Sequence, residues 1–204
     1  MNFFRTPFFL PWLYPQLTWK IPTREKTIYL TFDDGPVPGP TEFVLETLKA
    51  KNAQATFFCI GDNVSKHPAI YNQLRTHSHA LGNHTFNHVN GWNASSVQYK
   101  ENVEQCQQIM GGTTLFRPPY GRIKRSQIKM LANYSIIMWD VLTYDYAASV
   151  SPEQCLKGSI AATRKGSIVV FHDSLKAENN MTFALPRYID HFASLGFSFK
   201  ILPH

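Results

Sequence analysis

The stretch TIYLTFDDGP, residues 27–36, decides the fold class of this chain. Its first six residues, Thr27–Phe32, form an apolar segment typical of a buried strand. Asp33 and Asp34 follow at the C-terminal tip of that strand, directly before a Gly-Pro turn. Neighbouring strand residues point to opposite sides, but a turn starting at Gly35 can bring both carboxylates toward one site. One acid could hold a metal ion while the other moves protons, although Asp-Asp-Gly also occurs as a plain turn.

Strand-like and helix-like segments alternate along the 204 residues. This alternation predicts one α/β domain with a parallel sheet, either an open doubly wound sheet or a small (β/α) barrel. In both folds, functional residues gather at the C-terminal ends of the strands. The predicted strands are Thr27–Phe32, Ala55–Ile60, Ala80–Asn83, Thr114–Phe116, Ile136–Val141, Ser167–Phe171 and Ser198–Leu202. The predicted helices are Thr41–Lys51, Pro68–His77, Ser95–Met110, Ser126–Asn133, one that begins after Ser151, and Asn180–Leu195.

Capping residues and prolines indicate where several of these helices begin. A Ser-x-x-Gln capping box opens the helix at Ser95, and a second one opens the helix at Ser151, with proline at its first position. Pro186 lies inside the last predicted helix, where a proline removes a backbone donor. We therefore expect that helix to start nearer Leu185.

Composition and charge exclude several classes of protein. Hydrophobic residues make up 44% and charged residues 17% of the chain, which predicts a folded domain. The net charge is +6, but the basic residues are scattered, so we expect a solvated surface and no nucleic-acid partner. The three cysteines have no C-x-x-C spacing, which indicates neither a disulfide framework nor a cysteine zinc site. Cys59 is predicted to be a small buried hydrophobe.

Residues 1–26 form a separate N-terminal arm before the predicted catalytic domain, 27–204. Met1–Tyr14 is rich in Phe, Trp and Leu and is interrupted by prolines. It lacks the unbroken apolar core of a signal peptide and is too short to span a bilayer. We expect an apolar arm packed on the domain, and the alternative is a peripheral contact with a membrane or partner. Without an export signal or a disulfide pattern, the expected location is the cytoplasm.

A candidate metal site combines residues from two strand tips. His84 and His88 follow the strand Ala80–Asn83, and their i, i+4 spacing predicts two imidazoles on one face of a helical turn. With Asp34 they form a set of two histidines and one carboxylate, which suits zinc or another divalent first-row metal with bound water. His77 and His79 precede the strand, and we expect them to face away or to support the ligands.

The segment Arg117-Pro118-Pro119-Tyr120-Gly121 follows another predicted strand. Because two prolines carry no N–H, the amide of Tyr120 is the first free donor after Arg117. A stiff loop that presents one amide is a candidate oxyanion donor, and a rigid surface turn is the alternative. Arg117 could pair with a carboxylate at a strand tip and keep it ionised.

Two further strand tips carry polar residues. Asp145 lies between two tyrosines after the fifth predicted strand, in a loop that could stack on sugar faces. His172 ends the sixth predicted strand and has the basal pKa of a general acid. The strand rule thus places one set of residues at the same end of the sheet: Asp33, Asp34, His84, His88, Arg117, Asp145 and His172.

From Thr27 to Phe199 the chain resembles the NodB-type polysaccharide deacetylase family. Residues 31–35 match its Thr-Phe-Asp-Asp-Gly motif, residues 84–88 its His-x-x-x-His motif, and residues 117–121 its Arg-Pro-Pro-Tyr-Gly motif. Tyr146 stands where the family has Trp in its Asp-Trp motif. Val170 stands where the family has Leu in its Leu-x-His motif.

The resemblance implies a distorted (β/α) barrel with seven or eight strands and metal-dependent removal of acetyl groups from acetylated sugars. The implied metal is Zn2+, or Co2+, Ni2+ or Fe2+. The implied substrates are chitin oligomers, peptidoglycan or related glycans, with N-acetyl groups favoured. The implied roles are a base (Asp33), metal ligands (Asp34, His84, His88), an acid (His172), orienting residues (Arg117, Asp145), an oxyanion donor (Tyr120) and substrate-binding residues (Tyr120, Pro119, Tyr146, Val170).

Three other functions compete with this interpretation. A deacylase of a small N-acyl or O-acyl metabolite could use the same site, and the missing export signal favours it. A non-catalytic module that binds metal or glycan is disfavoured because all five catalytic positions are filled. A nucleic-acid binder would need a basic stripe with interleaved aromatic residues, and the sequence has none.

Overall fold

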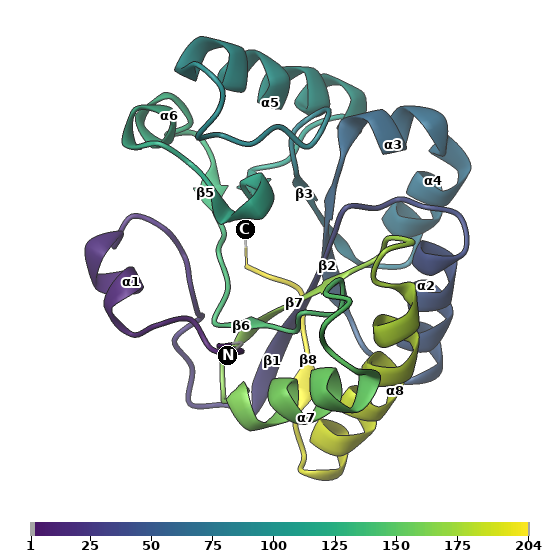
Figure 1. Cartoon of the computed structure of the whole chain (residues 1–204). Coiled ribbons are helices and arrows are strands. Elements are labelled where there is room, and N and C mark those ends of the chain that lie inside the picture. The colour runs from purple at the N-terminus through teal and green to yellow at the C-terminus, as the bar shows by residue number, and fades with distance from the viewer. Residues whose placement is uncertain (1–2, 204) are drawn as a thin grey trace.

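A computed structural model describes residues 3–203 as one curled parallel sheet covered by helices (Figure 1). The strands lie in the order β5-β4-β3-β2-β1-β7-β6, and β8 pairs with the first residues of β1. The predicted distorted barrel is confirmed. The strands are β1 (Thr27–Asp33), β2 (Ala55–Cys59), β3 (Ala80–Asn83), β4 (Leu115–Phe116), β5 (Ser135–Ile136), β6 (Val141–Leu142), β7 (Ile168–His172) and β8 (Ser198–Phe199).

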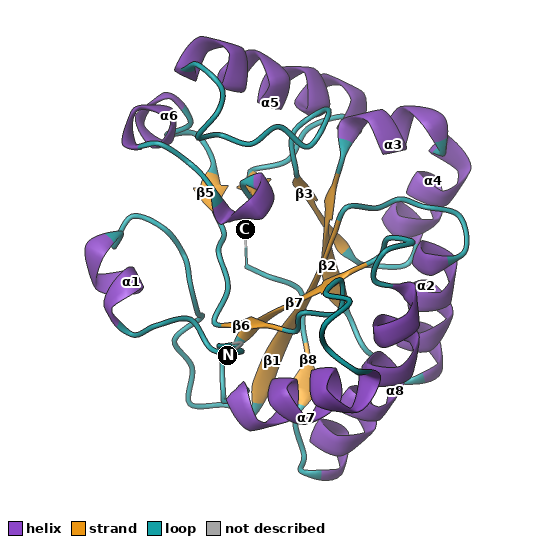
Figure 2. Cartoon of the chain, viewed as in Figure 1, coloured by secondary structure: helices purple, strands orange, loops and turns teal. Residues whose placement is uncertain are grey.

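Most of the helices pack around the outside of the sheet (Figure 2). The predicted capping boxes at Ser95 and Ser151 are both present. The helices are α1 (Phe9–Leu13), α2 (Pro40–Ala50), α3 (Gly61–Lys66), α4 (Pro68–Thr76), α5 (Ser96–Met110), the short 3-10 helix η1 (Pro119–Gly121), α6 (Arg125–Met130), α7 (Pro152–Ala162) and α8 (Glu178–Ser194). The helices α1 and α3 had no counterpart in the sequence prediction.

Strand β1 is fully buried. Its side chains face alternately the hydrophobic core on one side of the sheet and the candidate site on the other. Phe32 faces the helices and stacks on Phe57 of β2 and Phe171 of β7, at ring centroid distances of 5.1 and 6.1 Å. Thr31 and Asp33 point to the opposite side, as the period of two requires. The same strand therefore anchors the hydrophobic core and aims polar groups into the barrel.

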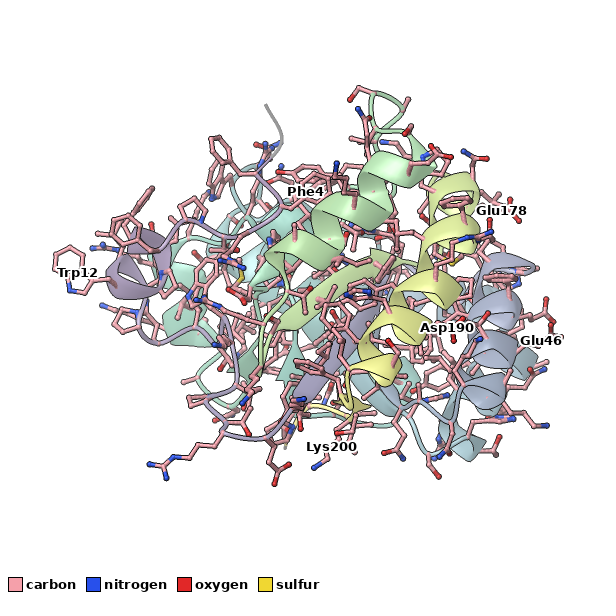
Figure 3. All side chains as sticks on the ribbon, turned by 90° about the horizontal axis from the view of Figure 1, so that it is seen from below. Phe4, Trp12, Glu46, Glu178, Asp190 and Lys200 are labelled. Atoms are coloured by element: carbon pink, nitrogen blue, oxygen red, sulfur yellow. The ribbon has the colours of Figure 1, made fainter. Side chains whose placement is uncertain are left out.

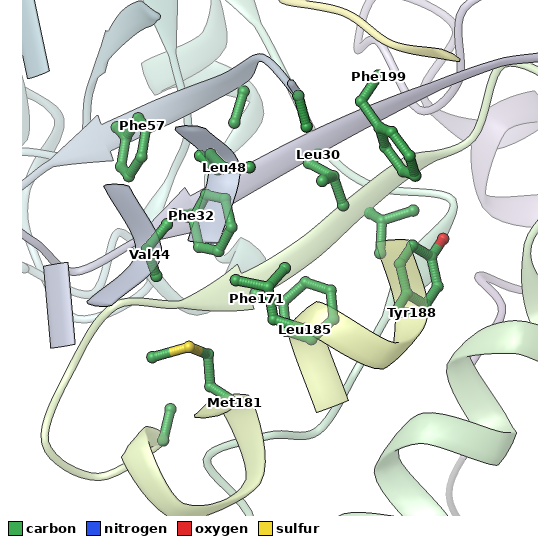
Figure 4. Packing of buried hydrophobic residues seen from close by; sticks show 14 of the residues in the cluster. Leu30, Phe32, Val44, Leu48, Phe57, Phe171, Met181, Leu185, Tyr188 and Phe199 are labelled. Carbon is green, nitrogen blue, oxygen red and sulfur yellow. The ribbon is translucent and has the colours of Figure 1, made fainter. Parts of the chain in front are cut away.

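Helix α8 begins at Glu178, so the expected start nearer Leu185 is wrong. Pro186 lies inside the helix, but several side chains of α8 are buried against the sheet. Leu185 lies beside Phe171 in that core (Figure 4). Burial of an apolar helix face contributes more than the lost hydrogen bond of one proline costs, so the helix continues through it.

The predicted strand Ile136–Val141 is two short strands, β5 and β6, with an irregular segment between them. The carbonyl oxygens of Ile137 and Met138 accept hydrogen bonds from the Arg117 guanidinium. The amide of Met138 donates to Thr18 of the arm, at 2.7 Å. Backbone groups committed to these partners are not available for a continuous ladder, which explains the break.

The described part of the arm, residues 3–26, runs along this break. Thr6 donates to the carbonyl of Asp140, at 2.8 Å, and Leu142 donates to that of Phe4, at 2.9 Å. Leu17 is buried, whereas no residue of α1 is. Trp12 of α1 points away from the protein (Figure 3). Among residues 3–203, no helix has both the length and the apolar character that a membrane span requires.

We predict that Leu185→Ala destabilises the fold by about 2–5 kcal/mol, because Leu185 is fully buried and truncation leaves a cavity. Leu195→Ala is the matched control, since Leu195 at the end of the same helix is 48% exposed. Its effect should stay within about 0.5 kcal/mol. Chemical denaturation of the three proteins measures both values, and equal effects would contradict the role of α8 in the core.

Candidate active site

Asp34, His84 and His88 come together as the sequence predicted. The Oδ1 atom of Asp34 lies 3.3 Å from Nε2 of His88 and 3.8 Å from Nε2 of His84. The three potential ligand atoms all lie within 4.8 Å of one another. Two imidazole nitrogens and one carboxylate oxygen at this separation fit a divalent first-row metal ion.

The segment that carries both histidines is a loop, so the expected helical turn is wrong. Thr85 and His88 have left-handed φ values of 65° and 56°. Side-chain amides hold the loop in place of helical hydrogen bonds: Asn83 accepts from the amide of Thr85 at 2.8 Å, and Asn102 of α5 accepts from that of Phe86 at 2.9 Å. The imidazole rings still approach to a centroid distance of 5.1 Å.

Hydrogen bonds and burial prepare both imidazoles to bind a cation. Nδ1 of His84 donates to the carbonyl of Arg117 at 2.8 Å, which leaves its Nε2 lone pair directed at Asp34. Burial lowers the pKa of His84 to about 4, despite the opposing carboxylates, so its ring is neutral at pH 7. Nδ1 of His88 lies 3.1 Å from the hydroxyl of Tyr120. Burial also lowers the pKa of His88, against the effect of Asp34.

Asp34 remains ionised beside these rings. Burial alone would raise the pKa of its carboxyl group, but His172, His84 and His88 outweigh burial and hold it below its usual value. The residue has a left-handed φ of 86°, and its carbonyl accepts a hydrogen bond from the side chain of Asn63 at 2.7 Å. This backbone turn separates the direction of Asp34 from that of Asp33.

Asp33 pairs with Arg117 instead of the histidines. Nη1 of Arg117 lies 2.6 Å from Oδ1 of Asp33, and both side chains are buried. The same nitrogen donates to Thr31 at 2.7 Å. The guanidinium also lies over the ring of Phe58, 4.2 Å from its centroid. The fixed cation holds the Asp33 carboxylate in one orientation, as a general base requires.

His172 and Asp145 form a second ion pair, in which Asp145 is buried and the His172 side chain is 14% exposed. Nδ1 of His172 donates to Oδ1 of Asp145 at 2.7 Å, and the His172 amide donates to the other carboxylate oxygen at 2.7 Å. Burial disfavours the charged ring, but Asp145 outweighs it and raises the pKa of His172 to about 9. The ring therefore carries a proton at neutral pH and can act as a general acid.

Asp173 is a site residue that the sequence prediction missed. Its carboxyl group accepts from the amide of Gly35 at 3.0 Å and from the Thr41 hydroxyl at 2.6 Å. A Cβ at Gly35 would collide with this carboxyl group, so only glycine fits the turn after Asp34. Burial raises the pKa of Asp173 to about 8. In the sequence, the position of Asp173 directly after His172 at a strand tip could have indicated that it belongs to the site.

The predicted substrate-binding residues lie around these pairs. Tyr120 has a left-handed φ of 60°, and Pro119 before it is buried. The ring of Tyr146 packs edge-on against His172, at a centroid distance of 4.8 Å. Val170 is fully buried two residues before His172 on β7. Substrate contact by these four residues stays a prediction.

The remaining histidines of this region do not join the site. His79 lies at the opposite end of the sheet, where its Nδ1 accepts from the amide of Ala55 at 3.4 Å. Burial lowers the pKa of His79 to about 4. His77 is exposed at the end of α4.

Comparison with known proteins identifies the family. The polysaccharide deacetylase family model matches residues 20–139. A peptidoglycan-N-acetylglucosamine deacetylase of Bacillus cereus is 31% identical over 191 residues, covering 90% of this chain and 89% of that protein. The chain belongs to the polysaccharide deacetylase family.

Two further similarities extend over almost the whole polysaccharide deacetylase chain. A chitooligosaccharide deacetylase of Azorhizobium caulinodans is 29% identical over 203 residues, covering 90% of this chain and 96% of that protein. The crystal structure of the Bc1960 peptidoglycan N-acetylglucosamine deacetylase with 4-naphthalen-1-yl-N-oxidanyl-benzamide is 29% identical, with a TM-score of 0.89 over 97% of this chain and 95% of that chain. The predicted enzyme class, a metal-dependent deacetylase, is thereby confirmed.

The geometry assigns separate chemical tasks to the residues of this deacetylase. Asp34, His84 and His88 would hold a divalent ion, which would supply Lewis-acid polarisation of a carbonyl group and lower the pKa of water. Asp33, fixed by its buried cation, can accept a proton from an attacking water molecule. His172 can give its proton to the leaving group.

We predict that Asp34→Ala loses the bound metal, because it removes one of the three ligands. Asp33→Asn should keep the metal and lower the turnover number at least about 100-fold, because the amide cannot accept the proton. Elemental analysis and an acetate-release assay on each variant measure the two effects. Asp190→Ala is the surface control and should change neither. Full activity of Asp33→Asn would remove Asp33 from the role of base.

We predict that the pH profile of kcat/KM depends on Asp145. The acid must be protonated, and the pKa of His172 is raised to about 9, so activity should fall as the pH rises through that value. Asp145→Asn removes the main stabilising charge and should shift this alkaline limb to lower pH. Asp140→Asn is the matched control, since Asp140 pairs with Arg164 and not with the site. If the alkaline limb of the pH profile stays at the same pH in Asp145→Asn, the proposed effect of Asp145 on His172 is wrong.

Proposed function

We propose that this chain hydrolyses the N-acetyl group of N-acetylglucosamine units in a glycan such as peptidoglycan or a chitin oligomer, with zinc as the metal. The observation that carries the proposal is the convergence of a metal-ligand set, a cation-fixed carboxylate and a protonated imidazole at one end of the sheet. Hydrolysis of an amide needs all three: carbonyl activation, a base for water and an acid for the amine.

The leaving group favours N-acetyl over O-acetyl substrates. An amine that departs from a tetrahedral intermediate must be protonated, whereas an alcohol leaves more readily. The raised pKa of His172 keeps that proton available at neutral pH. The names of the Bacillus cereus and Azorhizobium relatives, which refer to N-acetylglucosamine and chitooligosaccharide, agree with this choice.

The donor set supports zinc as the metal. Two neutral imidazoles and one carboxylate are typical ligands of catalytic zinc, and they leave positions for water or substrate. Co2+, Ni2+ and Fe2+ accept the same donors, so the affinity order alone does not select among them. Titration of the metal-free protein with each ion, followed by the acetate assay, distinguishes them.

The direct test is acetate release from N-acetylglucosamine oligomers, peptidoglycan fragments and acetylxylan. We expect acetate from the first two, loss of release on treatment with a chelator, and recovery with added zinc. Release from acetylxylan alone would show an O-acetyl esterase. Release only from small non-sugar acetamides would show a metabolite deacylase. The cytoplasmic location stays a prediction that fractionation of the source cells would check.

A further inference from the structure

A cavity lies between the N-terminal arm and the loop that carries Tyr120. Its volume is about 490 Å3, which is in the usual range for small-ligand sites. Phe3, Tyr14 and Trp19 of the arm line one side, and Trp92 and Tyr120 line the other. The walls thus come from segments far apart in the sequence. The arm residues among them, between residues 3 and 19, precede the part of the chain that the family model matches.

The arm is fixed against the sheet, so this cavity is preformed. Thr18 donates to the carbonyl of Ile136 at 2.9 Å, and the hydroxyl of Thr6 donates to that of Trp139 at 2.6 Å. The guanidinium of Arg5 donates to the carbonyl of Ala162. A wall held by backbone hydrogen bonds on both sides loses little entropy when a ligand binds.

Two aromatic contacts connect the cavity to the catalytic residues. On one side, the ring of Tyr120 packs on His88 at a centroid distance of 4.5 Å. On the other side, Tyr144 lines the cavity and packs on Tyr146 at 6.2 Å, and Tyr146 in turn contacts His172. A ligand in the cavity therefore lies one or two side chains from the metal ligands and from the acid.

The aromatic lining of the cavity favours a sugar. The lining residues carry no charge themselves, and the guanidinium groups of Arg122 and Arg125 lie over the rings of Trp92 and Tyr14, at 5.0 and 5.8 Å from the ring centroids. Half-exposed Trp and Tyr side chains offer flat apolar faces together with polar N–H and O–H groups, which suits a pyranose ring better than an aliphatic chain.

We infer that this cavity, with Trp92 and the arm residues Phe3 and Tyr14 as its walls, is a subsite for an N-acetylglucosamine unit next to the one being deacetylated. The inference rests on the proposed function, because it places a second unit of the same glycan. The subsite makes the enzyme act on oligomers in preference to short fragments. The N-terminal arm is thus part of the substrate site.

The test measures sugar binding without turnover, in zinc-loaded protein that carries Asp33→Asn. Isothermal titration with N-acetylglucosamine and with its dimer gives the affinities of a ligand that fills one position and of a ligand that fills both. We expect Trp92→Ala to weaken dimer binding about tenfold and to change monomer binding less than about twofold. Phe3→Ala should act in the same direction from the other wall. Both residues are more than half exposed, at 58% and 66%, so neither substitution threatens folding.

Trp12→Ala is the matched control, since Trp12 is 80% exposed on the outer side of α1 and does not line the cavity. Trp12→Ala should leave the dimer affinity unchanged. Unchanged affinity in both Trp92→Ala and Phe3→Ala would overturn the subsite. Binding of dodecanoate that Trp92→Ala weakens, with no such effect on the sugar dimer, would also overturn the subsite, in favour of an acyl chain. Acetate release by the parent enzyme decides the proposed function separately.

Discussion

One buried guanidinium organises this site. Arg117 contacts Asp33 at 2.6 Å and donates to the carbonyl groups of Ile137 and Met138. A buried arginine is costly unless its polar atoms are paired, and each of the three guanidinium nitrogens of Arg117 has a hydrogen-bond partner. The carbonyl of Arg117 also fixes the tautomer of His84. The tautomer of His84, the orientation of Asp33 and the break between β5 and β6 therefore all depend on one residue.

The position of the N-terminal arm also depends on Arg117. Because the segment between β5 and β6 turns its carbonyls toward Arg117, it forms no continuous strand, and the arm supplies hydrogen-bond partners there instead. Thr6 and Thr18 bind this segment, and Tyr14 between them lines the same cavity as Tyr120. A local interaction in the barrel thus determines what lies at the edge of the site.

The sequence predicted the parts that rest on local patterns. Apolar runs located the strands, and the strand-tip rule brought Asp33, Asp34 and His172 together. Spacing alone misjudged the histidine loop, because tertiary hydrogen bonds from Asn83 and Asn102 replace helical ones. Burial likewise carried α8 through Pro186. Asp173 escaped notice because its role depends on contact with Gly35, which is distant in sequence.

The two adjacent acids, Asp33 and Asp34, have different partners and are expected to have different roles. The most direct measurement is a crystal structure of the zinc-loaded protein, with the ion located by anomalous scattering. We predict one strong peak in contact with Asp34, His84 and His88, while Asp33 keeps its bond to Arg117. An ion bound by Asp33, or a peak away from these three residues, would contradict the account.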